Sequence, residues 1–181
     1  MSRWVVFFSQ TGSEILDLAA HFNRIPDTIV TTKSREQCEE LDLYKCFLDR
    51  FVFLSKKSSD DEYINAIGDG VRENSIVTLH GFMRILPSSI CDKYNIFNLH
   101  PGLINKYPEL KGKDPQIRAF ENTYDTVGAV IHRVISDVDS GEINDFVEFG
   151  HEGLDKRDFF NTFKNKSLQL WIGFLKKQHG F

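Results

Sequence analysis

Along the chain, short apolar runs typical of strands alternate with stretches whose apolar residues recur at helical spacing. Val5–Ser9 is a short, mostly apolar run, and a polar turn that contains Gly12 follows it. After the turn, Ile15, Leu18 and Ala19 recur at the spacing of one face of a helix. A strand, a glycine-containing turn and a helix in this order are typical of the first unit of an α/β fold.

Strand-like and helix-like patterns keep alternating to the end of the chain. Further apolar runs predict strands over residues 28–32, 51–54, 75–79, 95–99, 127–135 and 143–149. Amphipathic stretches predict helices over residues 36–41, from Ser59 through Ile67, directly after Pro87, and over 116–122 and 155–177. Residues 103–115 are rich in Pro, Gly and Lys, and we expect a loop there.

Strands that alternate with helices predict an α/β fold with a Rossmann-like, mostly parallel sheet and helices on both faces. A chain of 181 residues is long enough for one domain with a sizeable core, so we expect a single domain over residues 1–181. In such sheets, ligands bind beyond the carboxyl ends of the strands. Functional residues are therefore expected directly after the predicted strands 75–79 and 95–99.

Charge and cysteine content narrow the class of protein further. The formal net charge is −4, which argues against a non-specific nucleic-acid surface, because such surfaces gather Lys and Arg. No apolar run is long enough for a secretory leader or a membrane span. The odd number of cysteines, 3, then predicts reduced thiols in a cytoplasmic setting. We expect neither a nucleic-acid partner nor a membrane partner, and the sequence does not indicate an oligomeric state.

Polar residues that can carry chemistry follow the predicted strand 95–99. Asn98 and His100 lie two apart, so an extended chain presents both on one face. There an amide and an imidazole can stabilise a carbonyl oxygen that gains negative charge, an effect worth about 3 kcal/mol per donor. Asp139 can hold the charged imidazole or relay a proton. Alternatively, Asn98 ends the strand as a turn residue and His100 is a hydrogen-bonded surface group.

Several segments in order along the chain resemble the folate-dependent formyltransferases. They read Val-Thr-Leu-His-Gly-Phe-Met-Arg-Ile-Leu over 77–86, Phe-Asn-Leu-His-Pro-Gly-Leu over 97–103, Lys-Tyr-Pro over 106–108, and Asp-Val-Asp-Ser-Gly over 137–141. The chain is most similar to the phosphoribosylglycinamide formyltransferases of purine biosynthesis. The resemblance spans residue 3 to about residue 145 and implies one catalytic domain with the formyltransferase fold. It also implies 10-formyltetrahydrofolate as co-substrate, a small-molecule amine as acceptor, and no metal.

The resemblance assigns a role to each matching position. The catalytic positions are Asn98, His100 and Asp139. The positions expected to bind the folate are Met83, Arg84, Ile85, Leu86, His132, Asp137 and Val138, although His132 can instead be a hydrogen-bonded structural histidine. The positions expected to bind the acceptor are Thr11, Gly12, Ser13, Glu14 and Pro101.

Two acidic positions depart from the family pattern. In the family, the turn after the first strand binds a substrate phosphate through backbone N–H groups, and Asn stands where this chain has Glu14. A family Arg that contacts the same substrate matches Asp60 or Asp61. Carboxylates repel a phosphate, unless the Glu14 side chain turns to solvent or caps the helix. Lys164 or Lys166 can partly compensate.

Four functions therefore stay open. The acceptor can be glycinamide ribonucleotide, or a different amine, such as an amino sugar nucleotide or an aminated nucleoside. The same catalytic groups can pass the formyl group to water, which makes the protein a 10-formyltetrahydrofolate hydrolase. A non-catalytic paralogue that only binds folate is the fourth, and the presence of all three catalytic groups argues against it, because binding alone does not need them.

Overall fold

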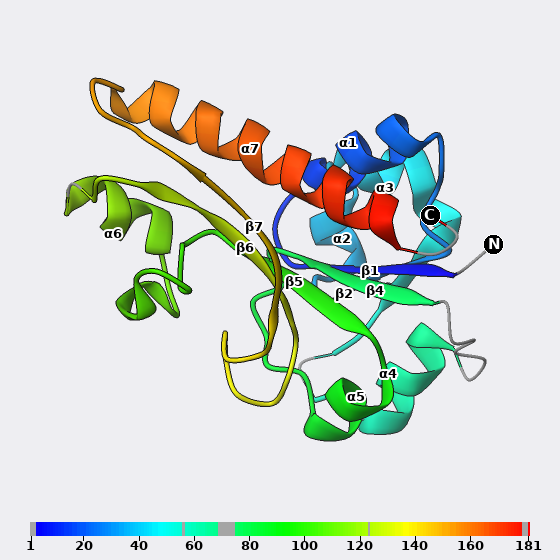
Figure 1. The fold of residues 1–181 in the computed structure, drawn as a ribbon. Coiled ribbons are helices and arrows are strands. Elements are labelled where there is room, and N and C mark those ends of the chain that lie inside the picture. The colour runs from blue at the N-terminus through cyan, green and yellow to red at the C-terminus, as the bar shows by residue number, and fades with distance from the viewer. Residues whose placement is uncertain (1–2, 56, 69–74, 123, 179–180) are drawn as a thin grey trace. The chain divides into compact units, whose positions relative to one another are not determined.

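The structure is a computed structural model that describes residues 3–55, 57–68, 75–122, 124–178 and 181 (Figure 1). The chain forms two compact units. Unit 1 runs to Phe97 and includes the C-terminal residues from Gln178, whereas unit 2 is Asn98–Lys177. Hydrogen bonding orders the strands as β3-β2-β1-β4-β5-β6-β7.

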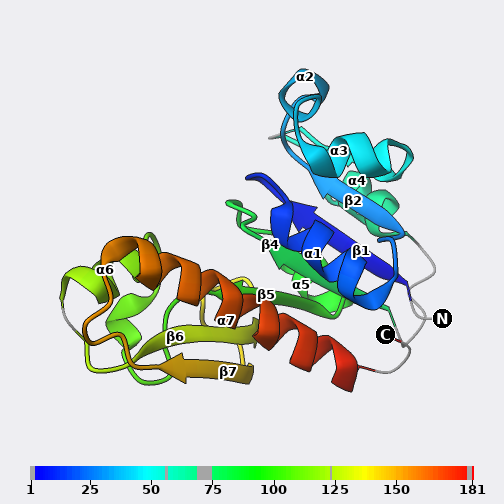
Figure 2. The ribbon, with the colours of Figure 1, turned by 90° about the horizontal axis from the view of Figure 1, so that it is seen from above.

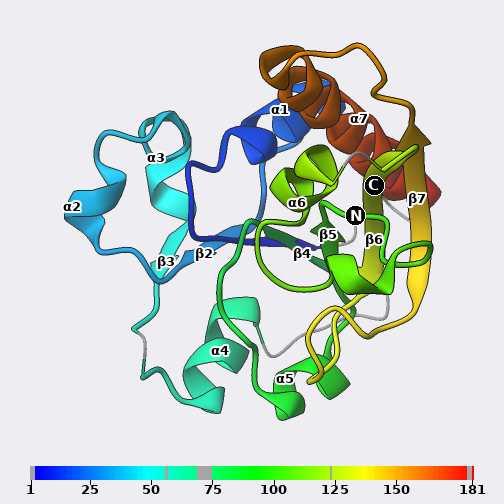
Figure 3. The ribbon, with the colours of Figure 1, turned by 90° about the vertical axis from the view of Figure 1, so that its left-hand side faces the viewer.

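Unit 1 holds a parallel sheet. Its elements are β1 (Trp4–Phe8), α1 (Ser13–Phe22), β2 (Thr28–Thr31), α2 (Arg35–Cys38), α3 (Asp42–Phe47), η1 (Leu48–Arg50), β3 (Phe51–Phe53), α4 (Asp60–Ile67), β4 (Ile76–His80), α5 (Ser88–Lys93) and the first part of β5 (Ile96–His100). β1 pairs in parallel with β2 and with β4, and β2 pairs in parallel with β3. Helices α1 and α3 cover one face of this sheet, and α4 and α5 cover the other (Figures 1 and 3).

The two faces of the unit 1 sheet are both apolar because helices cover both. Every residue of β1 is buried, as a strand enclosed on two sides requires. The Phe7 ring stacks on the ring of Tyr63 from α4, with 6.3 Å between the ring centroids. It also packs edge-on against Phe82, with 5.3 Å between the ring centroids. Ser34 and Ser59 each form a capping box at the start of α2 and α4, which satisfies backbone N–H groups that have no helical partner.

Unit 2 combines an antiparallel strand pair with a long helix. Its elements are the end of β5, η2 (Pro108–Leu110), α6 (Pro115–Glu121), β6 (Val127–Arg133), β7 (Ile143–Phe149) and α7 (Lys156–Lys177). β6 and β7 are antiparallel, with an irregularity in register between Ile131 and His132. Figure 2 shows α7 lying along both strands. The apolar side of α7 buries Phe159, Phe163 and Trp171.

The predicted α/β fold with a mostly parallel sheet is confirmed, and every predicted strand is present within two residues at either end. The antiparallel β7 is the exception that makes the sheet mixed. Three short helices, α3, η1 and η2, lie where no helix was predicted. Each has six residues or fewer, which is too short for helical periodicity to stand out. Within the described residues, no helix combines the length and the apolar character that crossing a membrane requires.

Candidate active site

Asn98 and His100 lie at the carboxyl end of β5 in unit 2. The strand is extended through both residues, so their side chains share one face. His100 is only 4% exposed, which contradicts the alternative that it is a surface group. Asn98 is half-buried and belongs to the strand, so it is not a turn residue that follows it. Both side chains are therefore held by the sheet and point into a region of restricted solvent access.

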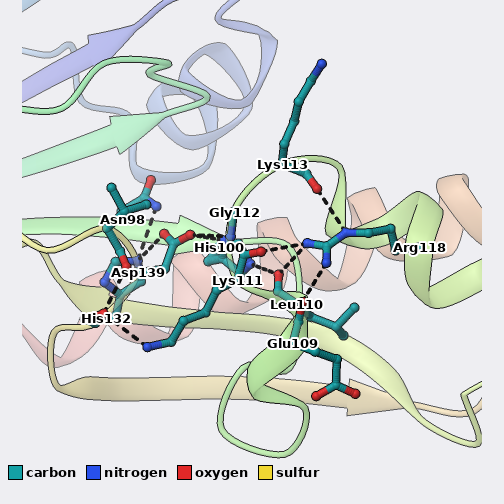
Figure 4. A network of polar contacts seen from close by, with 12 residues as sticks. Asn98, His100, Glu109, Leu110, Lys111, Gly112, Lys113, Arg118, His132 and Asp139 are labelled. Carbon is teal, nitrogen blue, oxygen red and sulfur yellow. Dashed lines mark hydrogen bonds and ion pairs between the residues drawn. The ribbon is translucent and has the colours of Figure 1, made fainter.

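Asp139 connects His100 and His132 in unit 2 (Figure 4). Its Oδ2 lies 3.2 Å from His100 Nδ1 and accepts a hydrogen bond of 3.0 Å from the backbone N–H of Gly112. Its Oδ1 lies 3.5 Å from His132 Nε2. Asp139 has a φ of 51° in the left-handed region, which Asp tolerates better than most residues. Asn98, His132 and Asp139, which the sequence separates by up to 41 positions, thus meet with His100 at one place.

The Asp139 carboxyl is held in its ionised form. Burial on its own raises the pKa of this carboxyl, but the hydrogen bonds from His100 and His132 oppose burial. The positive charge of His100 and the N–H of Gly112 add to them, and together they hold the pKa of Asp139 well below its ordinary value. Asp139 is therefore a carboxylate at neutral pH, available to pair with a charged imidazole or to accept a proton from a substrate.

Both ring nitrogens of His100 face oxygen acceptors. Nδ1 faces the Asp139 carboxylate, and Nε2 lies 2.9 Å from the backbone carbonyl of Leu110. A neutral imidazole carries only one N–H, so only the doubly protonated ring donates to both oxygens. The geometry thus favours a positively charged His100 beside a negatively charged Asp139. An ion pair of this kind can stabilise negative charge on a nearby substrate oxygen.

His132 links Asn98 to the same carboxylate. Its Nδ1 donates to the backbone carbonyl of Arg133 at 2.9 Å, which leaves Nε2 facing Asn98 Nδ2 at 3.3 Å and Asp139 at 3.5 Å. When Nε2 carries a proton, it donates to Asp139. When it carries none, it accepts from the Asn98 amide, whose Nδ2 keeps a second proton for a carbonyl oxygen. His132 is therefore well placed as a structural histidine that orients Asn98, and nothing in these contacts requires it to touch a folate.

The expected folate-binding segment of unit 1 follows β4. Met83 and Ile85 are 66% and 71% exposed, although both are large and apolar. The backbone N–H of Met83 donates to Ser9 Oγ at 3.2 Å, and Arg84 Nε donates to Thr32 Oγ1 at 3.1 Å, so the segment is fastened from both sides. Exposed apolar side chains on a fastened loop are typical of a ligand-binding surface. Leu86 is buried and anchors the end of the segment.

The remaining predicted folate and acceptor positions of unit 2 lie on its surface. Asp137 and Val138 are exposed on the turn that precedes Asp139, and Val138 is 53% exposed. Ser140 closes this turn, with its N–H donating to the carbonyl of Asp137. Pro101 is half-buried directly after β5. Val138 is thus the one large apolar side chain that this turn presents to a ligand.

The turn after β1 in unit 1 holds the predicted acceptor residues. Gly12 has a φ of 74°, and a Cβ there would come within 2.4 Å of the Leu43 side chain, so only glycine fits. Thr11 and Ser13 are exposed beside it. Glu14 neither turns to solvent nor caps the helix, because its Oε2 lies 2.6 Å from Nδ1 of His80 at the end of β4.

His80 connects Glu14 to a buried chain of hydrogen bonds. Its Nε2 lies 2.9 Å from Thr78 Oγ1, which also accepts from the indole N–H of Trp4 at 3.0 Å. Trp4 only donates, so the Thr78 hydroxyl is free to donate to His80 Nε2, and His80 Nδ1 then donates to the carboxylate. These hydrogen bonds are compatible with a neutral His80. With the ring neutral, the turn keeps the negative charge of Glu14, where an anion site would need none.

The other charged positions discussed from the sequence are exposed. Asp60 lies in the first turn of α4 and accepts a hydrogen bond from Ser89 Oγ, and Asp61 follows it. Lys164 and Lys166 lie on the exposed side of α7. Nothing in the contacts of the two lysines indicates a phosphate site.

Three groups of the site were not anticipated from the sequence. They are the His80 imidazole, the Leu110 carbonyl and the Gly112 N–H. His80 stands directly before the Gly-Phe-Met-Arg segment, which was a usable signal, whereas the two backbone groups leave no trace in residue type. Among the residues that the structure describes, no group of three or more His, Cys, Asp or Glu side chains is arranged to hold a metal ion.

Comparisons with known proteins agree with this geometry. Residues 3–145 match the family model described as formyl transferase. The chain is 29% identical over 150 residues to the phosphoribosylglycinamide formyltransferase of Escherichia coli, a match that covers 77% of this chain and 68% of that enzyme. It is 38% identical over 86 residues to the human trifunctional purine biosynthetic protein adenosine-3, which covers 45% of this chain and only 8% of that much longer protein.

A solved structure gives the same fold. The phosphoribosylglycinamide formyltransferase of Anaplasma phagocytophilum superposes with a TM-score of 0.81 at 22% sequence identity, over 97% of this chain and 85% of that one. At this level of identity, the likeness concerns the fold, and the residues of the site must carry the argument on function.

Proposed function

The chain belongs to the formyl transferase family, and from this premise we propose that it transfers a formyl group from 10-formyltetrahydrofolate to the primary amine of a small molecule. The observation that carries the proposal is the group formed by Asn98, His100 and Asp139 in unit 2. It offers an amide donor, a charged imidazole and a carboxylate within one set of contacts, which are the groups that acyl transfer to an amine needs.

The reaction follows from the state of each group. The neutral amine of the acceptor attacks the formyl carbon and forms a C–N bond, and the carbonyl oxygen becomes an oxyanion. The free proton on Asn98 Nδ2 donates to this oxyanion. His100 has both N–H groups engaged, so it acts on the oxyanion through its positive charge. The Asp139 carboxylate takes the proton from the attacking nitrogen and returns it, through water, to the folate nitrogen as the old C–N bond breaks.

Each unit by itself presents residues that we propose as folate contacts. In unit 1, the exposed Met83 and Ile85 and the backbone of Arg84 and Leu86 are the proposed contacts. In unit 2, the proposed contacts are Asp137 and Val138. His132 is assigned instead to orienting Asn98, because its two ring nitrogens already have partners.

Two kinds of acceptor are distinguished by the turn after β1. The relatives are named for phosphoribosylglycinamide, so glycinamide ribonucleotide is the first acceptor to test. The contact between Glu14 and His80 favours a second candidate, an amine that carries no phosphate at this turn, such as an aminated nucleoside or an amino sugar on a nucleotide. A fixed carboxylate would repel a phosphate, and the neutral His80 does not cancel its charge.

Hydrolysis of 10-formyltetrahydrofolate is the remaining enzymatic alternative. The same oxyanion stabilisation and the same carboxylate would serve if water replaced the amine. No described contact selects between water and an amine, so the products must decide. Formate without a formylated amine would mean hydrolysis, and folate binding without either product would mean a non-catalytic paralogue.

The deciding experiment is a transfer assay with 10-formyltetrahydrofolate and a panel of acceptors. The panel contains glycinamide ribonucleotide, amino sugar nucleotides, aminated nucleosides and buffer alone, and both tetrahydrofolate and formylated product are measured. We expect formylated amine with at least one acceptor, and loss of that product by orders of magnitude in His100→Ala and Asn98→Ala. A His100→Ala protein with near-normal turnover would overturn the catalytic assignment. Rapid turnover of glycinamide ribonucleotide would overturn the acceptor without phosphate.

A further inference from the structure

Arg118 holds together the loop that touches the catalytic pair in unit 2. The side chain comes from α6, and its guanidinium donates to four backbone carbonyls of one loop (Figure 4). These carbonyls belong to Glu109 at 2.6 Å, Leu110 at 3.1 Å, Lys111 at 2.7 Å and Lys113 at 3.0 Å. The loop of residues 109–113 therefore curls around one cation, and most of the five N–H donors of the guanidinium are used.

The same loop makes two direct contacts to His100 and Asp139. The carbonyl of Leu110 accepts from His100 Nε2 at 2.9 Å, and the N–H of Gly112 donates to Asp139 Oδ2 at 3.0 Å. Leu110 thus shares one carbonyl oxygen between His100 and Arg118. Any change in the loop moves both the acceptor that His100 uses and the donor that Asp139 uses.

Two other side-chain hydrogen bonds hold this loop, both at exposed positions: Tyr124 Oη donates to the Glu109 carboxylate at 2.7 Å, and Lys111 Nζ donates to Ser140 Oγ at 3.1 Å. Gly112 has a φ of 82° and Asp114, directly after the loop, a φ of 50°, so both positions lie in the left-handed region. Lys111, Gly112 and Lys113 are exposed, and only Leu110 inserts a buried side chain. An exposed loop with carbonyls that converge on one point needs a cation there to hold that shape.

We propose that Arg118 is a positioning residue for formyl transfer, which acts through the 109–113 loop to keep His100 and Asp139 in their paired geometry. The proposal rests on the proposed function only for its kinetic consequence. Without the guanidinium, the carbonyls repel one another and the loop opens, so the Leu110 and Gly112 contacts lengthen together. His100 then loses the acceptor that fixes its ring, and Asp139 loses one of the donors that stabilise its charge.

The kinetic experiment compares Arg118→Met, Arg118→Lys and Arg157→Met. Arg157 is an exposed arginine in the first turns of α7 and serves as the matched control for charge and size. We expect Arg118→Met to lower kcat by about tenfold to a hundredfold with a much smaller change in KM, because misplaced catalytic groups affect the reacting state more than substrate binding. Arg118→Lys should recover part of the loss, since one ammonium reaches fewer carbonyls, and Arg157→Met should behave as wild type.

A second readout does not depend on activity. The imidazole N–H signals of His100 in ¹H–¹⁵N NMR spectra report the bonds to Leu110 and Asp139. We expect the Nε2–H signal to shift or exchange with water in Arg118→Met and to persist in Arg157→Met. If Arg118→Met does not fold, Arg118→Lys carries both tests.

The outcomes separate the two proposals. Unchanged His100 signals together with unchanged kcat per folded molecule in the Arg118 variants would refute the positioning role, even if thermal stability fell. A wild-type protein that forms no formylated amine would refute the proposed function, and the NMR comparison would still decide whether Arg118 positions His100.

Discussion

A buried histidine faces a carboxylate in each unit, His80 in unit 1 and His100 in unit 2, and the hydrogen-bond partners of the two rings differ. In unit 1, His80 Nδ1 lies 2.6 Å from Glu14, and in unit 2, His100 Nδ1 lies 3.2 Å from Asp139. Both imidazoles are nearly inaccessible, at 1% and 5% side-chain exposure. Both imidazoles are thus buried and both face a carboxylate, so neither property distinguishes the two pairs.

The second ring nitrogen makes the difference. In His80 it faces the Thr78 hydroxyl, which can donate and leave the ring neutral. In His100 it faces the Leu110 carbonyl, which can only accept and therefore favours the charged ring. The group on the far side of the imidazole thus permits a neutral ring in the His80–Glu14 pair and favours a charged ring in the His100–Asp139 pair.

The largest test of this comparison is Asp139→Asn in unit 2. The amide leaves the shape nearly intact but removes the negative charge opposite His100, so we expect turnover to fall on the order of 10²-fold to 10⁴-fold. Single-turnover formyl transfer is the measurement. Asp158→Asn, at an exposed position in α7, is the control that should keep wild-type turnover. A fall of less than about threefold would leave Asp139 without a role in the chemistry.

Thr78→Val tests the neutral chain of unit 1. Valine keeps the shape but removes the hydrogen bonds that the Thr78 hydroxyl makes with Trp4 Nε1 and His80 Nε2, so we expect a loss of about 1–3 kcal/mol in unfolding free energy. Urea unfolding followed by far-UV circular dichroism measures it. Thr162→Val, at a half-buried position of α7, should change stability far less. Equal losses in the two variants would argue that the Thr78 hydroxyl has no special partner.

Glu14→Gln sharpens the functional side of the same comparison. Removing the charge should raise kcat/KM for an acceptor that carries a phosphate by about tenfold and leave kcat/KM for an uncharged amine nearly constant. Asp17→Asn removes the same charge from the next turn of α1 and is the control. If both acceptors gain equally, Glu14 does not select between them.

The smallest expected effect is the acid dependence of stability. Because the folded pKa of Asp139 lies below the ordinary value, its ionised form stabilises the fold above about pH 4. That contribution disappears as pH falls through the folded pKa, so the unfolding free energy of the wild type should drop more steeply below about pH 4 than that of Asp139→Asn. Parallel curves for the two proteins would contradict the low pKa.

The elements whose apolar residues follow a regular spacing could be predicted from the sequence. The apolar runs gave all the strands, and the serines at positions 34 and 59 marked the starts of two helices. β7 alternates between half-buried and exposed residues, which is the pattern of an antiparallel strand with one open face, yet it was not distinguished from the buried strands. Helix α3 has a single buried side chain, Leu43, and depends on contact with α1 rather than on its own pattern.

The candidate site divides in the same way. Asn98, His100 and Asp139 could be named because their side chains carry chemistry that residue type reveals, and their meeting in unit 2 supports the prediction. The Leu110 carbonyl and the Gly112 N–H belong to the backbone, so no residue type could mark them. Residues 103–115 were expected to be only a loop. The order that Arg118 gives to this loop comes from hydrogen bonds to backbone carbonyls, which exist only in the folded chain.

The glycine at position 12 has a consequence for how this protein can evolve. Its φ of 74° and the closeness of Leu43 leave no room for another residue, so the path of the backbone through the turn is fixed. Variation in the turn is therefore expected in the side chains next to the glycine, among them Glu14 with its partner His80. We expect that the charge of the turn can change at these side chains while the path of the backbone stays the same.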